Sequence, residues 1–294
     1  MDFTFGIITL GDAKDRVDKI IDSIISQNIP NFEIIIVGGE NEHEDIECVK
    51  HFDFDESIKK GWITAKKNLI TAKSSYENIV YLHDYFVLED GWYEGFLEFG
   101  DDWDVCMNIL IGSDGNRYID WISIADPQIA ASGYRDGRLV PYDYNKTNTM
   151  YVSGGYWVAK KDFMFENPLE EKRAWGESED YEWSFRVNRV INCNYRMNAL
   201  SACRAIKDGK TSRGKHNGRS STGQRWQKCS INTVYHGDGG DPLKQLDPLG
   251  ARSPTSTPVS QILCNKHGWP MFEFTYVVDW KNPSAHVECN FLEK

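Results

Sequence analysis

The stretch Phe32-Glu-Ile-Ile-Ile-Val-Gly-Gly39 is an almost continuous apolar segment that ends in two glycines. Strands without polar alternation are typical of parallel sheets, because helices cover both of their faces. A similar run over residues 3–10 comes earlier, and apolar residues recur at helical spacing over 17–25 between the two runs. The order strand, helix, strand predicts a βαβ unit with a right-handed crossover.

The same alternation continues to about residue 200 and predicts an α/β fold, with an open, mostly parallel sheet flanked by helices. We expect strands over 78–83, 103–110 and 151–159 and helices over 62–74, 92–99 and 183–190. Beyond residue 200 the sequence is basic and then rich in Pro, Ser and Thr. We therefore expect a core over 1–200 and, packed on the same domain, a basic loop with an irregular C-terminal extension over 201–294.

Composition excludes several classes of protein. The 294 residues include 33 Lys and Arg against 44 Asp and Glu, a net charge of −11, which argues against a nucleic-acid partner. No apolar run approaches the about 18 residues that a membrane span needs, and the N-terminus does not resemble a signal peptide. The seven cysteines are odd in number and widely spaced, and no pair has the spacing of a zinc site, so we expect reduced thiols. We expect a cytoplasmic protein without a transmembrane segment; the oligomeric state stays open.

Three predicted strands end in glycine or polar residues. Ligands of open parallel sheets bind beyond the carboxyl ends of the strands. These ends carry Thr9 and Gly11, then Gly38-Gly39-Glu40, and then His83-Asp84. Glycines let a ligand approach the backbone closely, although Gly38 and Gly39 also suit a plain turn.

The pair His83-Asp84 suits half of a site for Mn²⁺ or Mg²⁺. Carboxylates suit both hard ions, and Mn²⁺ accepts imidazole more readily than Mg²⁺ does. His236 is the preferred third ligand, since it ends an apolar run and a strand end holds a ligand more rigidly than the loop around His216. Alternatively, Asp84 caps the strand end and His83 is simply hydrogen-bonded.

Two other acidic segments are candidates for a functional role. Asp53 and Asp55 alternate as on a strand edge; we expect them to face solvent and keep them as a fallback metal motif. The segment from Trp175 to Glu182 gathers several acids before a predicted helix. Acids are favoured at a helix start by its dipole, but one of them could also act as a general base toward an acceptor hydroxyl.

At these positions the chain resembles inverting glycosyltransferases of the GT-A fold, of the family-2-like kind, over about residues 3–200. The resemblance rests on the order and spacing of several blocks. They are 7–10, 33–41, 61–68, 78–86, 152–161 and the pair Glu179-Asp180.

This resemblance implies a metal-dependent, non-processive transferase. It would move a sugar from a nucleoside-diphosphate sugar to a hydroxyl of a glycan, lipid or protein-linked acceptor, with inversion and with Mn²⁺ or Mg²⁺ held by Asp84, His83 and His236. Asp180 would be the base and Glu179 would orient it. Two departures stand out: His83-Asp84-Tyr85 replaces the Asp-x-Asp motif, and Gln224-Arg225-Trp226 lacks the spacer of the processive Gln-x-x-Arg-Trp motif.

Further roles follow from the resemblance. The nucleotide sugar would contact Thr9, Gly11, Gly38, Gly39, Glu40, Lys66, Asn68 and Arg225, with Lys207 and Arg213 as other candidates for the phosphates. The acceptor would contact Gly154, Gly155 and Trp175. Lys66 and Lys67 equally suit a solvated helix face, and Trp175 equally suits the core. A catalytically inactive nucleotide- or carbohydrate-binding protein of the same fold is the alternative function.

Overall fold

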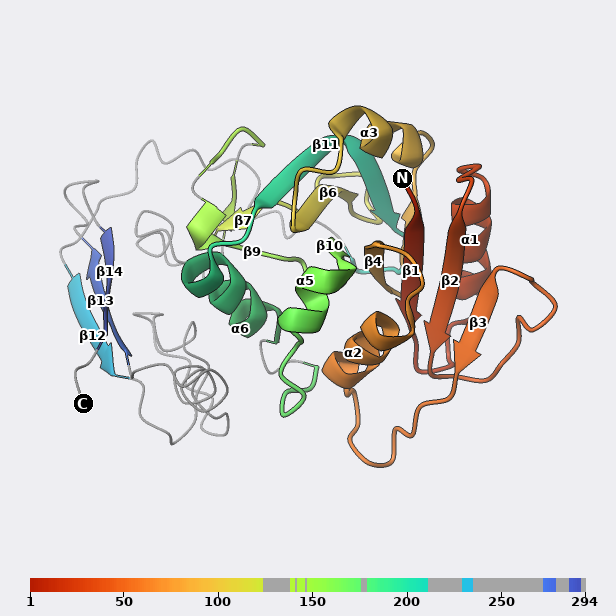
Figure 1. The fold of residues 1–294 in the computed structure, drawn as a ribbon, viewed down its shortest axis with the longest axis horizontal. Helices are drawn as coiled ribbons and strands as arrows, with labels where there is room; N and C mark the ends of the chain where they lie inside the picture. The colour runs from red at the N-terminus through yellow and green to blue at the C-terminus, as the bar shows by residue number, and fades with distance from the viewer. Residues whose placement is uncertain are drawn as a thin grey trace.

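An eight-stranded sheet forms the centre of the molecule (Figure 1). Its order is β3 (Val49–Phe52), β2 (Phe32–Val37), β1 (Phe3–Ile8), β4 (Asn78–His83), β10 (Tyr156–Lys160), β6 (Val105–Ile111), β11 (Tyr195–Ala205) and β5 (Phe86–Leu88). All of these strands run the same way except β10 and β5. The expected α/β fold with a mostly parallel sheet is confirmed.

This computed structural model describes residues 1–123, 138–140, 142–145, 147–175, 179–210, 229–234, 272–278 and 286–291. Its helices are α1 (Lys14–Ile25), α2 (Ile63–Lys73), α3 (Trp92–Phe99), α5 (Lys161–Glu166) and α6 (Glu179–Phe185), with a 3₁₀ turn at Thr147–Thr149 and a π-helical turn at Arg186–Ile191. A small antiparallel sheet joins β7 (Ile122–Ser123), β8 (Arg138–Leu139) and β9 (Met150–Tyr151). In the C-terminal part, β12 (Cys229–Val234), β13 (Phe272–Val278) and β14 (His286–Phe291) form another.

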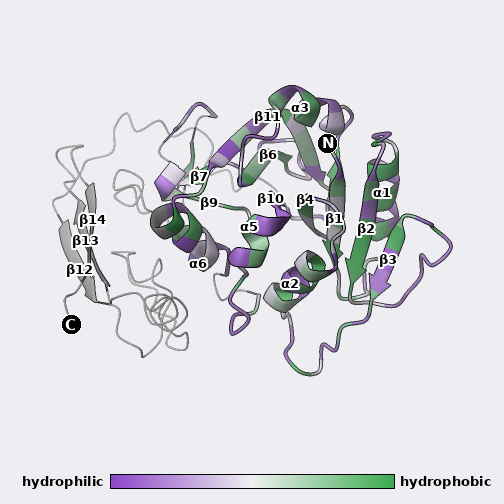
Figure 2. Cartoon of the chain, in the orientation of Figure 1, coloured by the Kyte–Doolittle hydropathy of each residue, from purple (hydrophilic) through white to green (hydrophobic). Residues whose placement is uncertain are grey.

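Side chains of β1 show why its sequence is apolar throughout. Phe3 packs against Trp92 and Phe96 of α3, at ring-centroid distances of 5.1 and 5.4 Å. Gly6 points to the other face, where a Cβ atom would lie 2.3 Å from Ile70 of α2. Helices therefore cover both faces of the strand, so neither face has polar alternation. The helix α1 carries both green and purple bands in Figure 2, because only its face with Val17, Ile20, Ile21 and Ile24 is buried.

The register of the parallel strands decides where the polar strand ends lie. Ile8 of β1 pairs with Val37 of β2 on one side and with His83 of β4 on the other. The next residues along the chain, Thr9 and Asp84 among them, therefore leave the sheet at one edge, which we call the carboxyl edge. The strands β6 and β11 end at the same edge, because both run parallel to β4.

Some elements differ from the sequence-based expectation. The helix expected over 183–190 begins at Glu179, so the acids at 179 and 180 lie in its first turn. The strand β11 was not predicted, and it continues across the predicted boundary at residue 200; a register shift between Asn198 and Ala202 interrupts its pairing. Among the described residues, no helix has both the length and the apolar character that crossing a bilayer requires. Cys48, Cys106, Cys193 and Cys203 are free thiols.

Candidate active site

The carboxylate of Asp84 joins the ends of β1 and β4. The hydroxyl of Thr9 donates to its Oδ2 at 3.0 Å and accepts a bond from the Gly11 N–H at 3.1 Å. Arg16 of α1 donates from Nε to the Asp84 carbonyl at 3.0 Å, and its Nη2 lies 3.9 Å from Oδ2. Burial raises the pKa of Asp84 above its ordinary value, while the Thr9 hydrogen bond and the Arg16 charge act in the opposite direction.

The glycines at this edge serve contacts between loops. Gly38 has a φ of +91°, and a Cβ atom on it would lie 2.5 Å from the Thr9 carbonyl oxygen and 2.6 Å from Lys66 Nζ. A Cβ on Gly11 would lie 2.9 Å from the Cα of Gly39. The two loops touch because neither carries a side chain there.

Two consecutive lysines of α2 are buried, with 2% and 1% of Lys66 and Lys67 exposed, so they do not form a solvated helix face. Lys66 donates to the Thr9 carbonyl at 2.6 Å and forms an ion pair with Glu56. Lys67 donates to the Gly154 carbonyl at 2.7 Å. Burial lowers the pKa of Lys67 from 10.5 to about 8, against the opposing charges of Glu179 and Asp180.

The imidazole of His83 lies half-buried among cations. Burial and the charges of Lys67, Lys210, Lys66 and Lys207, in decreasing order, hold its pKa well below the ordinary 6.5. The ring is therefore neutral at pH 7. Its Nε2 atom is buried without a hydrogen-bond partner. A buried polar atom of this kind is costly unless a ligand or water completes it.

Tyr85 lies between His83, the first residue of the predicted metal motif, and the acids Glu179 and Asp180. These two acids are in the first turn of α6, which we call the acidic turn. Its ring is 5.6 Å from that of His83, and a Cβ atom on Gly155 would lie 2.6 Å from its hydroxyl oxygen. Burial raises the pKa of Tyr85, and the negative charges of Asp84, Asp180 and Glu179 add to the effect. The phenol therefore stays protonated, and it interacts electrostatically with the carboxylates at the end of β4 and at the start of α6.

The start of α6 packs against the turn before β10. A Cβ atom on Gly154 would lie 2.9 Å from Asp180 Oδ2 and 3.3 Å from Glu179 Oε1. Glu179 is 6% exposed, so its carboxylate is removed from water. The charges of both acids act on Lys67 and Tyr85, which are neighbours of His83 and Asp84. The structure thus brings the acidic turn and the end of β4 into one site.

Other predicted site residues lie at the margin of this site or elsewhere. The Asn68 amide donates to the Leu169 carbonyl at 2.9 Å and accepts from the Leu169 N–H at 3.0 Å, so it holds the loop after α5. Trp175 is 73% exposed, which excludes a place in the core, and its N–H donates to the Gly61 carbonyl at 2.8 Å. Glu40 is exposed beside Gly39.

The remaining candidates divide into two groups. Asp53 and Asp55 follow the edge strand β3 and are exposed, as expected for residues that face solvent. The other candidates lie outside the described residues: His216, His236, Arg213, Arg225 and the Gln224-Arg225-Trp226 run.

The described residues do not complete the predicted site for a divalent cation. Among the residues that the structure describes, no three His, Cys, Asp or Glu side chains come together as metal ligands. Asp84 offers one carboxylate, which Thr9 and Arg16 already contact, and the imidazole of His83 lies in the field of four lysines. Metal dependence stays a prediction that relies on His236.

Sequence reasoning did not assign a role to Arg16, Lys67 or Lys210. Lys67 was recognised only as the neighbour of Lys66, and Lys210 only as one of many basic residues after 204. The sequence held one signal for Lys210. Sites in parallel sheets form at the carboxyl ends of strands, so a prediction of β11 as a strand would have placed the turn after it at the carboxyl edge. For Arg16, no signal in the sequence pointed to Asp84.

Comparisons with known proteins bear on the fold. No protein-family model matches the chain, and the search of curated proteins finds no match. Among solved structures, GalNAc-T7 with UDP, GalNAc and Mn²⁺ is similar, at 15% identity and a TM-score of 0.54, over 75% of this chain and 46% of that one. TarS of S. aureus is similar at 13% identity and a TM-score of 0.51, over 70% and 37%.

At these identities the likeness is one of fold. The expected GT-A-like glycosyltransferase fold is confirmed. The matched part spans less than half the length of either structure. Activity, substrates and cofactor therefore require an argument from the site itself.

Proposed function

We propose that the protein is a non-processive glycosyltransferase, which moves a sugar from a nucleoside-diphosphate sugar to an acceptor hydroxyl with inversion. The observation that carries this proposal is the meeting of two segments, the strand end at Asp84 and the acidic turn at Asp180, around Tyr85 and Lys67. In such an arrangement a nucleotide would bind at the carboxyl edge, with a carboxylate across from it.

In the proposed reaction, Asp180 takes the proton of the acceptor hydroxyl as its oxygen attacks the anomeric carbon. The bond from that carbon to the diphosphate oxygen breaks, and the nucleoside diphosphate leaves from the opposite face. Glu179 orients the base or binds hydroxyls of the donor sugar. General-base catalysis of this kind contributes about 10²- to 10⁴-fold.

The binding residues follow from the same arrangement. Thr9, Gly11, Gly38, Gly39 and Lys66 gather at the ends of β1 and β2, which supports the donor side, with Glu40 at its rim. Gly154 and Gly155 adjoin the acidic turn and Trp175 is exposed, which supports the acceptor side. Asn68 would act through the loop that it holds. UDP is the first nucleotide to test, because GalNAc-T7 of similar fold was crystallised with it.

The test compares Asp180→Asn with native protein in a screen of nucleotide sugars for sugar transfer and for nucleotide release. We expect transfer to fall by about 10²-fold or more, with nucleotide affinity unchanged. Asp90→Asn is the matched control, since Asp90 is exposed and has no role in the proposed site. Equal loss of binding and transfer would assign Asp180 a structural role.

An inactive binding protein of the same fold is the second candidate. The observation that favours it is the imidazole and the phenol at the first and third positions of His83-Asp84-Tyr85, where the resembled enzymes have carboxylates. Nucleotide binding in calorimetry without turnover of any donor would support this alternative over the transferase.

A further inference from the structure

The turn that follows β11 is fixed over Tyr85. The N–H of Ile206 donates to the Tyr85 carbonyl at 2.8 Å, and the N–H of Ser113, after β6, donates to the Lys210 carbonyl at 2.9 Å. A further bond of 3.2 Å joins the N–H of Lys210 to the carbonyl of Lys207 across the turn. Backbone contacts on two sides therefore hold this turn, which carries Lys207, Asp208, Gly209 and Lys210, against the carboxyl edge.

The ammonium groups of this turn lie over the ring of Tyr85, the last residue of the predicted metal motif. Nζ of Lys210 is 4.5 Å from the centre of the Tyr85 ring, and Nζ of Lys207 is 6.0 Å from it. Lys207 is exposed and Lys210 half-buried, so a ligand that enters from solvent can meet both. Asp208, the acid of the turn, is exposed.

The other lysines near Tyr85, Lys66 and Lys67, are buried. Lys66 contacts Glu56 and the Thr9 carbonyl, and Lys67 contacts the Gly154 carbonyl between the charges of Glu179 and Asp180. Asp84 is contacted by Arg16 and Thr9. Lys207 is exposed and Lys210 is half-buried, so the turn after β11 offers its ammonium groups to a ligand from solvent more readily than Lys66 and Lys67 do.

We propose that Lys207 and Lys210 bind the diphosphate of the donor and neutralise its charge as it leaves, in the role that a divalent cation has in the metal-dependent reaction. This proposal rests on the proposed function. When the bond from the anomeric carbon to the phosphate oxygen breaks, its electron pair stays on the diphosphate, which gains one negative charge. The acceptor proton goes to Asp180. Ammonium groups on a turn whose backbone is already held in place stabilise this charge with little reorganisation.

Asp84 has a different role under this proposal. Its carboxylate would repel a diphosphate, but with Thr9 and Arg16 around it, it positions the loop after β1 and the start of α1. The two ways of neutralising the leaving group therefore give opposite expectations for Asp84. A metal site needs this carboxylate, whereas a lysine site binds the anion without it.

The experiment measures binding of inorganic pyrophosphate and of UDP to the full chain by calorimetry, in EDTA and in Mn²⁺. We expect both to bind in EDTA, and Lys207→Gln with Lys210→Gln to weaken binding at least tenfold. Lys210→Arg, which keeps the charge, should retain most of the affinity. Lys19→Gln is the matched control, because Lys19 is exposed on α1. Asp84→Asn should bind pyrophosphate in EDTA as well as native protein or more tightly, and thermal unfolding checks that each variant is folded.

The outcomes separate this inference from the proposed function. Binding and transfer that both require Mn²⁺ and are lost in Asp84→Asn would overturn the lysine site and leave the transferase standing. Pyrophosphate binding in EDTA that depends on the two lysines, without turnover of any nucleotide sugar, would support the lysine site and contradict the transferase. No pyrophosphate binding in either buffer would overturn the lysine site.

Discussion

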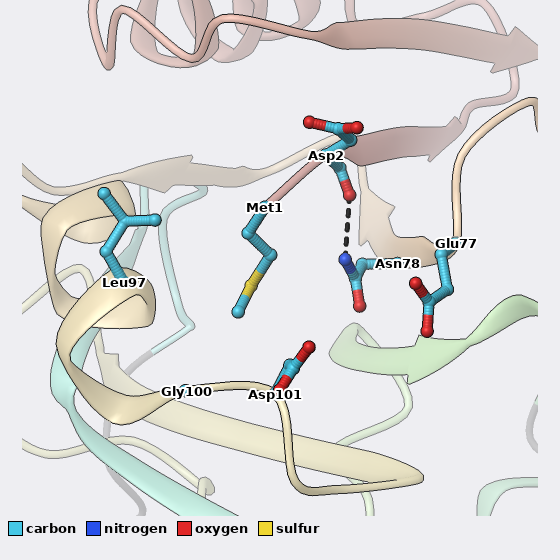
Figure 3. Close-up of a pocket in the computed structure, with 7 residues that line it drawn as sticks. All are labelled: Met1, Asp2, Glu77, Asn78, Leu97, Gly100 and Asp101. Atoms are coloured by element: carbon cyan, nitrogen blue, oxygen red, sulfur yellow. Dashed lines mark hydrogen bonds between the residues drawn. The ribbon is translucent and has the colours of Figure 1, made fainter.

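The two edges of the central sheet differ in how deeply their charged side chains are buried. At the carboxyl edge, Lys67 and Glu179 are buried and act on each other across chain segments far apart in sequence. At the amino edge, a pocket of about 350 Å³ is lined by Met1, Asp2, Glu77, Asn78, Leu97, Gly100 and Asp101 (Figure 3). Two of its three acids, Glu77 and Asp101, are exposed: Glu77 is 70% exposed and forms an ion pair with Lys160 at 3.1 Å.

This difference shows that charged residues near a sheet edge do not by themselves make a catalytic site. Both edges collect charges because in-register strands begin and end together. Exposed charges are screened by water, whereas charges held close together in a buried setting shift one another's pKa values. Perturbed groups in one place are typical of functional sites, and the carboxyl edge has them.

The largest expected effect comes from Gly38→Ala, which would break the contact between the loops of the carboxyl edge. The new Cβ would meet Thr9 and Lys66 at a residue with positive φ, so strain and overpacking add. We expect the free energy of unfolding to fall by roughly 3 kcal/mol in urea denaturation. Gly91→Ala is the control: its φ is +79° but no atom lies within 4 Å of the new Cβ, so only about 1 kcal/mol should be lost. Equal losses would mean that the loop contact is unimportant.

The next effect is a pH dependence of stability, which tests whether the charge of Lys67 at the carboxyl edge is buried. The pKa of Lys67 is about 8 in the folded protein and 10.5 ordinarily, so the unfolded chain holds more protons between these values. The contribution of Lys67 to stability therefore rises as pH increases from 8 to 10.5, by up to roughly 3 kcal/mol. Lys67→Met should lack this rise. Denaturation curves for the two proteins at several pH values test it, and a constant difference between them would contradict the burial of this charge.

The smallest effect is expected at the amino edge. Asp101→Asn removes one carboxylate from the pocket in Figure 3, where the side chain is exposed. We expect the free energy of unfolding to change by about 0.5 kcal/mol or less, with pyrophosphate and UDP affinity unchanged. Calorimetry and denaturation provide the measurements. A clear loss of nucleotide affinity would mean that the two edges are coupled and would weaken their contrast.

Much of the fold was predictable because buried parallel strands are apolar throughout. Phe32–Val37 and Asn78–His83 were expected with the bounds that the structure gives them. The strand β11 was not, since polar residues and an interrupted register hide its pattern. Without this strand, the turn at Lys207 could not be assigned to the carboxyl edge.

The candidate site was predictable in part. That Thr9 and Asp84 meet follows from two strands ending together, as the βαβ pattern indicates. The burial of Lys66 and Lys67 was not predictable, because two consecutive lysines on a helix are usually solvated. Nor did any local pattern connect Arg16 to the end of β4.

The sequence alone determined the order of the main apolar strands and of the helices between them, with the polar residues at their ends, because periodicity and apolar runs are local properties of the chain. Only the tertiary structure decided which charges are buried and which act on one another. Lys67 and the Gly154 carbonyl that it contacts are 87 residues apart. Electrostatic interactions depend on distance and burial, and both are set by the packing of segments that no local pattern relates.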